Sequence, residues 1–211
     1  MALQRVELTA PFQPFIHRWR KVVELLDPAA TEDVAARSHL QLLHETLLEE
    51  LGEVIKAKHD MVENGVIDFE HLYTIFEPGR LIFSTENGKD RLFQLIATAK
   101  VSDPCSGTQY QNISRRYADM DGAKFGTANK VIVIHDFQGT VKIDTLVAFP
   151  VEFHAYKEAL MQGLVRRGKA FEDLFGHHFR AYKGIASGYT QAGYGMVKYD
   201  LEDWIQSHFG H

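Results

Sequence analysis

Five basic side chains near the end of the chain are the residues whose type and spacing could do chemistry. Arg166, Arg167 and Lys169 form a tight group, and Arg180 and Lys183 follow a short distance on. Guanidinium and ammonium groups bind carboxylates and phosphates, so this basic cluster could contact an anion or an acidic partner protein. The alternative is structural, because the helix dipole favours cations toward the C-terminus of a helix.

Eleven histidines raise the question of a metal site. His177 and His178 are adjacent, and His208 and His211 are three residues apart. The sequence contains no His-Glu-x-x-His motif and no cysteine pair, which are the usual patterns for zinc. We therefore expect surface or core histidines, with no metal and no cofactor.

The sequence offers no nucleophile with an evident base beside it. Cys105 is the single cysteine, and the turn-rich segment around it predicts an exposed loop. Asp119-x-Asp121-Gly122 begins like a calcium loop but lacks the remaining ligands, so it predicts a turn. No Gly-x-x-x-x-Gly-Lys-Ser/Thr motif occurs. We expect no catalytic residues and neither tight binding nor hydrolysis of ATP.

Two amphipathic helices are expected before residue 65. The first carries an apolar stripe and ends at Asp27-Pro28: Phe15, Ile16, Trp19, Val22, Val23 and Leu26. The second begins at Thr31 as N-cap, ends at Asn64-Gly65 and carries its own stripe: Leu40, Leu43, Leu47, Leu51, Val54 and Val62. We expect both stripes to pack against a sheet, with Trp19 in the core.

Residues 66–150 carry the strand signals. About five short antiparallel strands are expected between residues 80 and 149, and five such strands often close as a barrel. The interpretation is an SH3-like barrel, with a curved sheet as the alternative. Its centre is a predicted hairpin over Lys130 to Phe153, turning at Gln138-Gly139. Asn87-Gly88 predicts a second hairpin, with a loop a little longer than two residues.

Residues 151–211 return to a helical period. The predicted helix lines one face with Leu160, Leu164, Phe171, Leu174 and Phe175. Two short strands, 179–185 and 195–199, should flank a glycine-rich loop, and a closing helix should cover 200–205. The fold class is therefore α+β, and we expect a single domain over 1–211 with parts 1–65, 66–150 and 151–211.

Composition narrows the classes of function. The net charge of −5 and pI near 6.1 give no overall field for nucleic acid, so nucleic-acid binding is not expected. One cysteine fits a reducing compartment. No apolar run is long enough to span a bilayer and no signal peptide is evident, so we expect a cytoplasmic or nuclear protein that is not in a membrane. The sequence does not indicate an oligomeric state.

Six stretches occur in a recognisable order: APFQPFIHRW, FEHLYTIFEPGRLIFS, RRYADMDGAKFG, IVIHDFQGTVKIDTLVAFPVEFH, LVRRGKAFEDLFGHHFRAYKGIA and GMVKYDLEDW. Together they resemble a fungal domain of unknown function that is found N-terminal to AAA-type ATPase modules. The resemblance implies a non-catalytic interaction or regulatory domain that recruits a client or positions the motor. Its partner would be a client protein or the adjoining ATPase.

The alternative is a small enzyme or ligand-binding barrel with a pocket near the barrel mouth. Buried titratable side chains that converge in one cleft would favour the alternative. A surface with an apolar patch and no pocket would favour the interaction domain.

Overall fold

The structure is a computed structural model, and it describes residues 10–27, 33–121, 124–173, 185–189 and 196–200. The backbone forms two compact units, Met1–Ala170 and Phe171–His211, which we describe separately. The single domain over 1–211 stays a prediction. Within the described ranges, no helix combines the length and the apolar character that crossing a bilayer requires.

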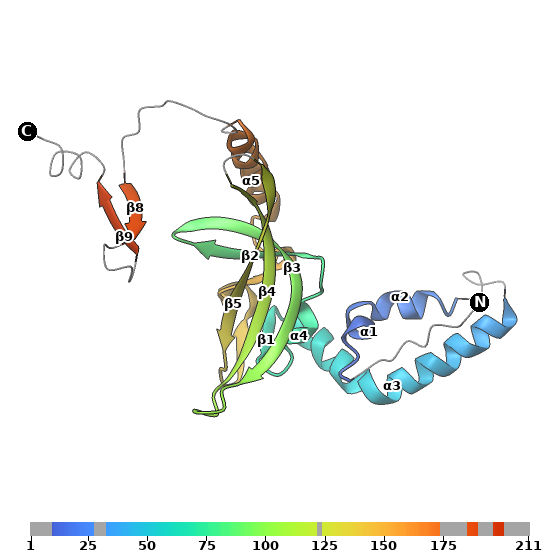
Figure 1. The fold of residues 1–211 in the computed structure, drawn as a ribbon. Helices are drawn as coiled ribbons and strands as arrows, with labels where there is room; N and C mark the ends of the chain where they lie inside the picture. The colour runs from blue at the N-terminus through green and yellow to red at the C-terminus, as the bar shows by residue number, and fades with distance from the viewer. Residues whose placement is uncertain (1–9, 28–32, 122–123, 174–184, 190–195, 201–211) are drawn as a thin grey trace, which may run out of the picture. The chain divides into compact units, whose positions relative to one another are not determined.

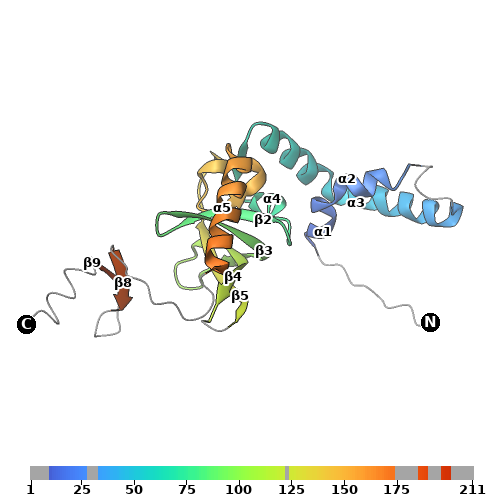
Figure 2. The ribbon, with the colours of Figure 1, turned by 90° about the horizontal axis from the view of Figure 1, so that it is seen from above.

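The N-terminal helices pack on one another (Figures 1 and 2). The predicted first helix is broken at Arg18 into α1 (Gln13–His17) and α2 (Trp19–Glu24). Both run alongside α3 (Val34–Glu63). The prediction that their stripes pack against the sheet holds only for Val62, which packs against the main core. Other stripe members instead form a separate apolar cluster: Ile16, Leu47 and Leu51 with Phe12, Phe15, Trp19, Val54, Ile55 and Tyr73.

Trp19 is a half-buried member of this helical cluster, and its ring stacks on His44 with 5.1 Å between centroids. At the start of α3, Asp33 is the N-cap, and its Oδ1 accepts from the backbone N–H of Ala35 at 2.9 Å. The predicted cap, Thr31, lies outside the described residues. The predicted helix end is confirmed, because Asn64 is the C-cap and Gly65 follows with φ of +66°.

The main sheet is five-stranded and antiparallel, in the order β5-β4-β3-β2-β7. Its strands are β2 (Leu81–Glu86), β3 (Lys89–Ser102), β4 (Gln109–Met120), β5 (Phe125–His135) and β7 (Phe149–Pro150). Among the strands that the structure describes, β5 and β7 are both edges and do not pair with each other, so the SH3-like barrel is not confirmed. The alternative of a curved sheet describes the observed strands (Figure 1).

The predicted central hairpin is wrong in its pairing. β5 pairs with β4 along its whole length, whereas β6 (Thr140–Lys142) pairs with β1 (Val66–Asp68). A turn does lie at Gly139, whose φ is +71°, but it connects strands of two different sheets. Alternation of apolar residues identified both runs as half-buried strands, yet alternation does not specify the partner of a strand.

The turn at Asn87-Gly88 is tighter than predicted. Glu86 pairs with Lys89, so the loop between β2 and β3 contains only two residues. Their φ angles are +51° and +68°, the conformation of a type I′ hairpin. Asparagine and glycine tolerate positive φ better than other residues, which explains why the chain turns here.

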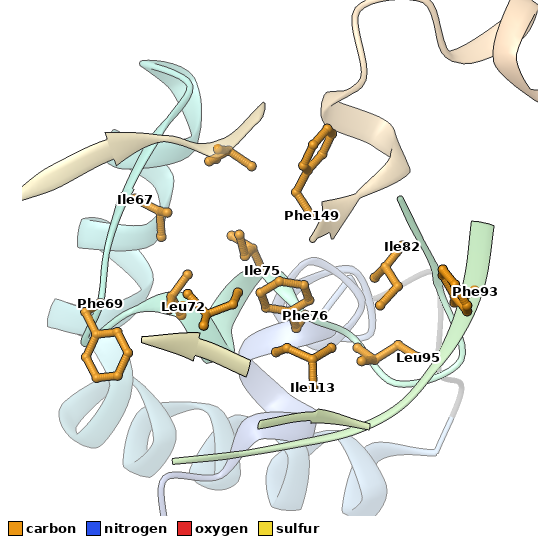
Figure 3. Packing of buried hydrophobic residues seen from close by; sticks show 12 residues of the cluster. Ile67, Phe69, Leu72, Ile75, Phe76, Ile82, Phe93, Leu95, Ile113 and Phe149 are labelled. Carbon is orange, nitrogen blue, oxygen red and sulfur yellow. The ribbon is translucent and has the colours of Figure 1, made fainter. Parts of the chain in front are cut away.

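One apolar core fills the space between the curved sheet, β1, β6 and α4 (Leu72–Ile75). Phe76 is fully buried and lies among Ile75, Leu95 and Ile113 (Figure 3). Two 3₁₀ turns, η1 (Ile143–Thr145) and η2 (Val151–Phe153), add further side chains. The buried members of the core are Ile67, Phe69, Leu72, Ile75, Phe76, Ile82, Phe93, Leu95, Ile113, Ile134, Ile143 and Phe149.

The predicted C-terminal helix is present as α5 (Lys157–Glu172) and continues through Gly168. Leu174 and Phe175 lie outside the described residues. Beyond α5, β8 (Ile185–Tyr189) and β9 (Met196–Asp200) form an antiparallel hairpin. β9 matches the predicted second strand. β8 corrects the prediction, because it occupies residues assigned to the glycine-rich loop. Of the predicted closing helix only Asp200 is described, and it ends β9.

Candidate functional site

The basic cluster lies on an exposed helix. Arg166, Arg167 and Lys169 are all exposed in the second half of α5. Arg180 and Lys183 lie outside the described residues. α5 is described throughout, and none of its sixteen residues is buried. The structure therefore brings three of the five predicted residues together on one surface helix.

The three cations do not share one face of α5. Arg166 and Lys169 are three residues apart, so they are neighbours on the helix surface, with Val165 beside them. Val165 is 59% exposed. Arg167 points elsewhere, because its Nη2 donates to the main-chain carbonyl of Asp90 in β3. Arg166 and Lys169 with Val165 thus form a mixed cationic and apolar surface, which we call the α5 surface.

A second candidate site is a surface cavity of about 320 Å³ between α1, α3, α4 and η2. Helices and loops far apart in the sequence contribute its walls. The lining residues are His17, Lys58, Val62, Thr74, Ile75, Glu77, Arg80, Pro150, Glu152 and Phe153. A neighbouring cavity of about 360 Å³ shares His17 and Glu77 with it. We call the first of these the His17 cavity.

His17 is neutral at physiological pH. Burial lowers its pKa from 6.5 to about 4, and the positive charge of Lys58 acts in the same direction. Glu77 and a hydrogen bond to the backbone of Thr74 oppose the shift. The Nε2 atom of His17 is shielded from solvent and has no hydrogen-bond partner in the described part of the chain.

The remaining polar groups of the His17 cavity set its charge. The Nζ of Lys58 donates to the Ile16 carbonyl at 3.3 Å, and burial lowers the pKa of this lysine while Glu77 raises it. The Oε2 of Glu77 accepts from Arg80 at 3.0 Å, and its Oε1 lies 3.8 Å from Arg18. The walls of the cavity therefore include a neutral imidazole, a desolvated ammonium and a carboxylate that already has partners.

The depressed pKa of His17 predicts a dependence of stability on pH. Above pH 6.5 the ring is neutral in both the folded and the unfolded protein. As the pH falls from 6.5 to 4, the ring binds a proton in the unfolded chain but not in the folded protein. The free energy of unfolding should therefore fall over this range. After allowance for partial exposure we expect a loss of about 1–3 kcal/mol from this group. Urea unfolding measured across the range tests this expectation.

His17→Asn isolates this contribution, because asparagine is also polar but does not titrate. The stability of this variant should depend less steeply on pH than that of the wild type. His59→Asn is the matched control, since the side chain of His59 is 67% exposed. A pH dependence that is equal in wild type and His17→Asn would contradict the depressed pKa.

A buried ion pair lies in the sheet. The side chain of Arg115 is 3% exposed, and its Nη2 donates to Oε1 of Glu86. Its guanidinium lies 3.8 Å from the ring centroid of Phe93. Glu86 also pairs with Lys130 at 3.2 Å. Burial lowers the pKa of Arg115 and the carboxylate opposes this effect, so Glu86 is the group that makes the buried cation tolerable.

The other residues considered for chemistry lie in turns or outside the described chain. Cys105 is exposed, and its N–H donates to Asp103, which lowers the pKa of that carboxyl. Asp121 accepts from the backbone of Lys124 at 2.7 Å in the turn before β5. The paired histidines near the end lie outside the described residues. Within the described ranges, no three His, Cys, Asp or Glu side chains are grouped to hold a metal ion.

Sequence reasoning missed the His17 cavity, although one signal was present. Lys58 lies four residues after Val54 and four before Val62, so it interrupts the apolar stripe of α3. A lysine on an apolar stripe indicates an ammonium that is carried into a partly buried position. His17 gave no such signal, because only the fold brings α1 next to Thr74 and Glu77.

Comparison with known proteins covers part of the chain. Residues 57–155 match a family described as a domain of unknown function, DUF7025. The matched stretch contains every residue that lines the His17 cavity except His17, and it excludes the α5 surface. No curated protein and no solved structure shows significant similarity to the chain.

Proposed function

We propose that this chain is a non-catalytic interaction and regulatory domain that contacts an acidic segment of a partner protein through the α5 surface. The observation that carries the proposal is that α5 has no buried residue and exposes Arg166 and Lys169 beside Val165. Cations next to an exposed apolar side chain suit a partner that offers carboxylates and some apolar area. The partner is a client protein or an adjoining AAA-type ATPase module.

The resemblance to domains that precede AAA-type ATPases supports the choice of partner. A regulatory domain of this kind would recruit a client or position the motor. Exposed apolar side chains on α3 offer further contact area: Val34, Leu42, Leu43 and Leu48 are between 38% and 71% exposed.

Charge reversal of the α5 surface is expected to weaken capture of the partner. Arg166→Glu with Lys169→Glu should reduce binding in a pull-down analysed by mass spectrometry, and the reduction should be larger at low salt, where attraction is least screened. This pair leaves Arg167 bonded to Asp90, so the melting temperature should not change. Adding Arg167→Glu gives the full triple variant.

Lys21, Lys56 and Lys142, each changed to Glu, provide the matched control. All three are exposed, and the control alters net charge as much as the triple variant does. We expect the control to capture the partner as the wild type does. Equal capture by wild type and by the α5 variants would eliminate α5 as the contact, and turnover of ATP by the purified chain would overturn the non-catalytic assignment.

Ligand binding is a second candidate function, and the His17 cavity favours it. Titratable groups with perturbed pKa values that converge in a cavity are typical of binding and active sites. Here His17 and Lys58 are such groups. The two functions are compatible, because the cavity and the α5 surface do not share residues.

A further inference from the structure

We propose that the edge strand β5 pairs with β5 of a second copy of the chain, antiparallel about a two-fold axis at Val133. The two five-stranded sheets would then form one continuous sheet. In this register Lys130 lies opposite Asp136 of the second copy, and residues 130–136 pair in each copy. The inference goes beyond the contact proposed for α5 and stands independently of it, because β5 and α5 share no residues.

β5 is the less protected edge of the main sheet (Figure 1). It is eleven residues long, contains no proline and pairs with β4 without a bulge. The opposite edge, β7, has only two residues, and one of them is Pro150. Short length, proline and bulges are devices that keep sheet edges from pairing with other chains. β5 has none of these three devices, so it is open to the addition of a strand.

The backbone of β5 offers hydrogen-bonding groups at alternate residues. The N–H of Asp136 donates to the Gln109 carbonyl at 3.1 Å, so the even-numbered residues of β5 bond to β4. The odd-numbered Val131, Val133 and His135 therefore point their N–H and C=O groups away from β4. Within the described part of the chain, these three N–H groups have no backbone partner. The axis at Val133 supplies one for each, because it pairs Val131 with His135 and Val133 with itself.

Charge complementarity selects the second copy and the register. The Lys130 side chain is 48% exposed, and the carboxylate with which it pairs, Glu86, is shared with the buried Arg115. A lysine on an edge strand discourages pairing unless an acid lies opposite it. Asp136 is exposed and is the only acidic residue between 125 and 136. Only the axis at Val133 brings this aspartate opposite Lys130, and the symmetry forms the ion pair twice.

Apolar side chains lie on both faces of the proposed junction. Ile132 and Ile134 pack against the main core, and each would lie opposite the other in the second copy. On the other face Val131 is 57% exposed and would be covered by His135. A junction of about seven residues a side is smaller than the about 20–30 residues of a standard interface, so we expect a dissociation constant between about 1 µM and 1 mM.

Sedimentation velocity of the purified 211-residue chain over a range of concentrations measures this association. Val131→Pro removes an N–H that points away from β4, so it should weaken association by about tenfold or more while circular dichroism still shows the folded chain. Val131→Thr is the matched control, because it keeps both the N–H and the branched shape, and it should associate as the wild type does. A dimer that Val131→Pro does not weaken would overturn the proposal.

Reversed charges test the register. Lys130→Asp and Asp136→Lys should each weaken self-association, because like charges then lie opposite one another. An equimolar mixture of the two variants restores opposite charges at both pairs, so it should associate more tightly than either variant alone, and less so at high salt. A mixture that associates no better than its components would place the axis elsewhere and overturn the register.

Hydrogen exchange of the wild type distinguishes the second copy from other occupants of β5. The amides of Val131, Val133 and His135 should exchange slowly at high protein concentration and rapidly on dilution. Slow exchange at every concentration would show that another part of the same chain covers β5. A chain that stays monomeric up to about 1 mM, with rapid exchange throughout, would leave the edge to a different protein. Either result would overturn the proposal.

Discussion

Replacing Phe76 with alanine is expected to lower the free energy of unfolding by about 3–5 kcal/mol. Phe76 is fully buried and lies at the junction of α4 and the sheet among Ile75, Leu95 and Ile113 (Figure 3). Truncation removes the buried aromatic ring and leaves a cavity that the neighbours on three different elements, α4, β3 and β4, cannot fill. Urea unfolding followed by circular dichroism measures the change.

Tyr156→Ala is the control for this experiment, because its side chain is also aromatic but the residue is 76% exposed. We expect that variant to change stability by no more than about 0.5 kcal/mol. A domain has about 5–15 kcal/mol of stability, so the loss in Phe76→Ala is a large fraction of the total. Similar midpoints for the two variants would show that Phe76 does not lie in the core.

Local patterns in the sequence predicted the elements well. The apolar stripe of α3 and its Asn64-Gly65 end identified the long helix, and turn residues separated the strands of the sheet. These signals succeed because helical and strand periods follow from the chain's own geometry. The turn at Gly139 was predicted for the same reason, since few other residues adopt a φ of +71°.

Pairings between distant segments were not predictable in this way. The stripes of α1 and α3 indicated burial, but their buried members pack against each other, and only Val62 of the α3 stripe packs against the core of the sheet. β5 takes β4 as its partner over its full length, and β6 pairs with β1, which lies far before it in the chain. An apolar side chain only requires an apolar neighbour, so the sequence pattern leaves the choice of neighbour open.

The two candidate sites differ in the same way, because the sequence predicts one of them and not the other. The basic cluster on α5 could be predicted because its members are adjacent in sequence, and helix geometry also separates Arg167 from Arg166 and Lys169. The bond of Arg167 to Asp90 could not be predicted, because it joins distant parts of the chain. The His17 cavity could not, because its walls come from α1, α3, α4 and η2. A perturbed pKa arises from burial and from neighbouring charges, and both of these exist only after folding.

Replacing Glu86 with alanine should also be strongly destabilising, by about 3–5 kcal/mol, because it leaves a buried charge without its partner. The Arg115 side chain is 3% exposed, and Glu86 is the carboxylate to which its Nη2 donates. Its Nε and Nη1 have no hydrogen-bond partner within the described residues, so no other acceptor there can replace Glu86. Thermal and urea unfolding of the variant would measure the loss.

The double variant Glu86→Ala with Arg115→Met separates an uncompensated charge from a simple loss of contacts. Methionine keeps apolar contact with Phe93 and removes the cation, so the double variant should recover most of the stability lost in Glu86→Ala. Glu70→Ala is the matched surface control: Glu70 pairs with Lys100 at 2.7 Å, but their side chains are 67% and 41% exposed, and we expect a loss below about 1 kcal/mol. If Glu86→Ala and Glu70→Ala lower the free energy of unfolding equally, burial of Arg115 does not determine the strength of the Glu86–Arg115 pair. The double variant should then show no recovery of stability.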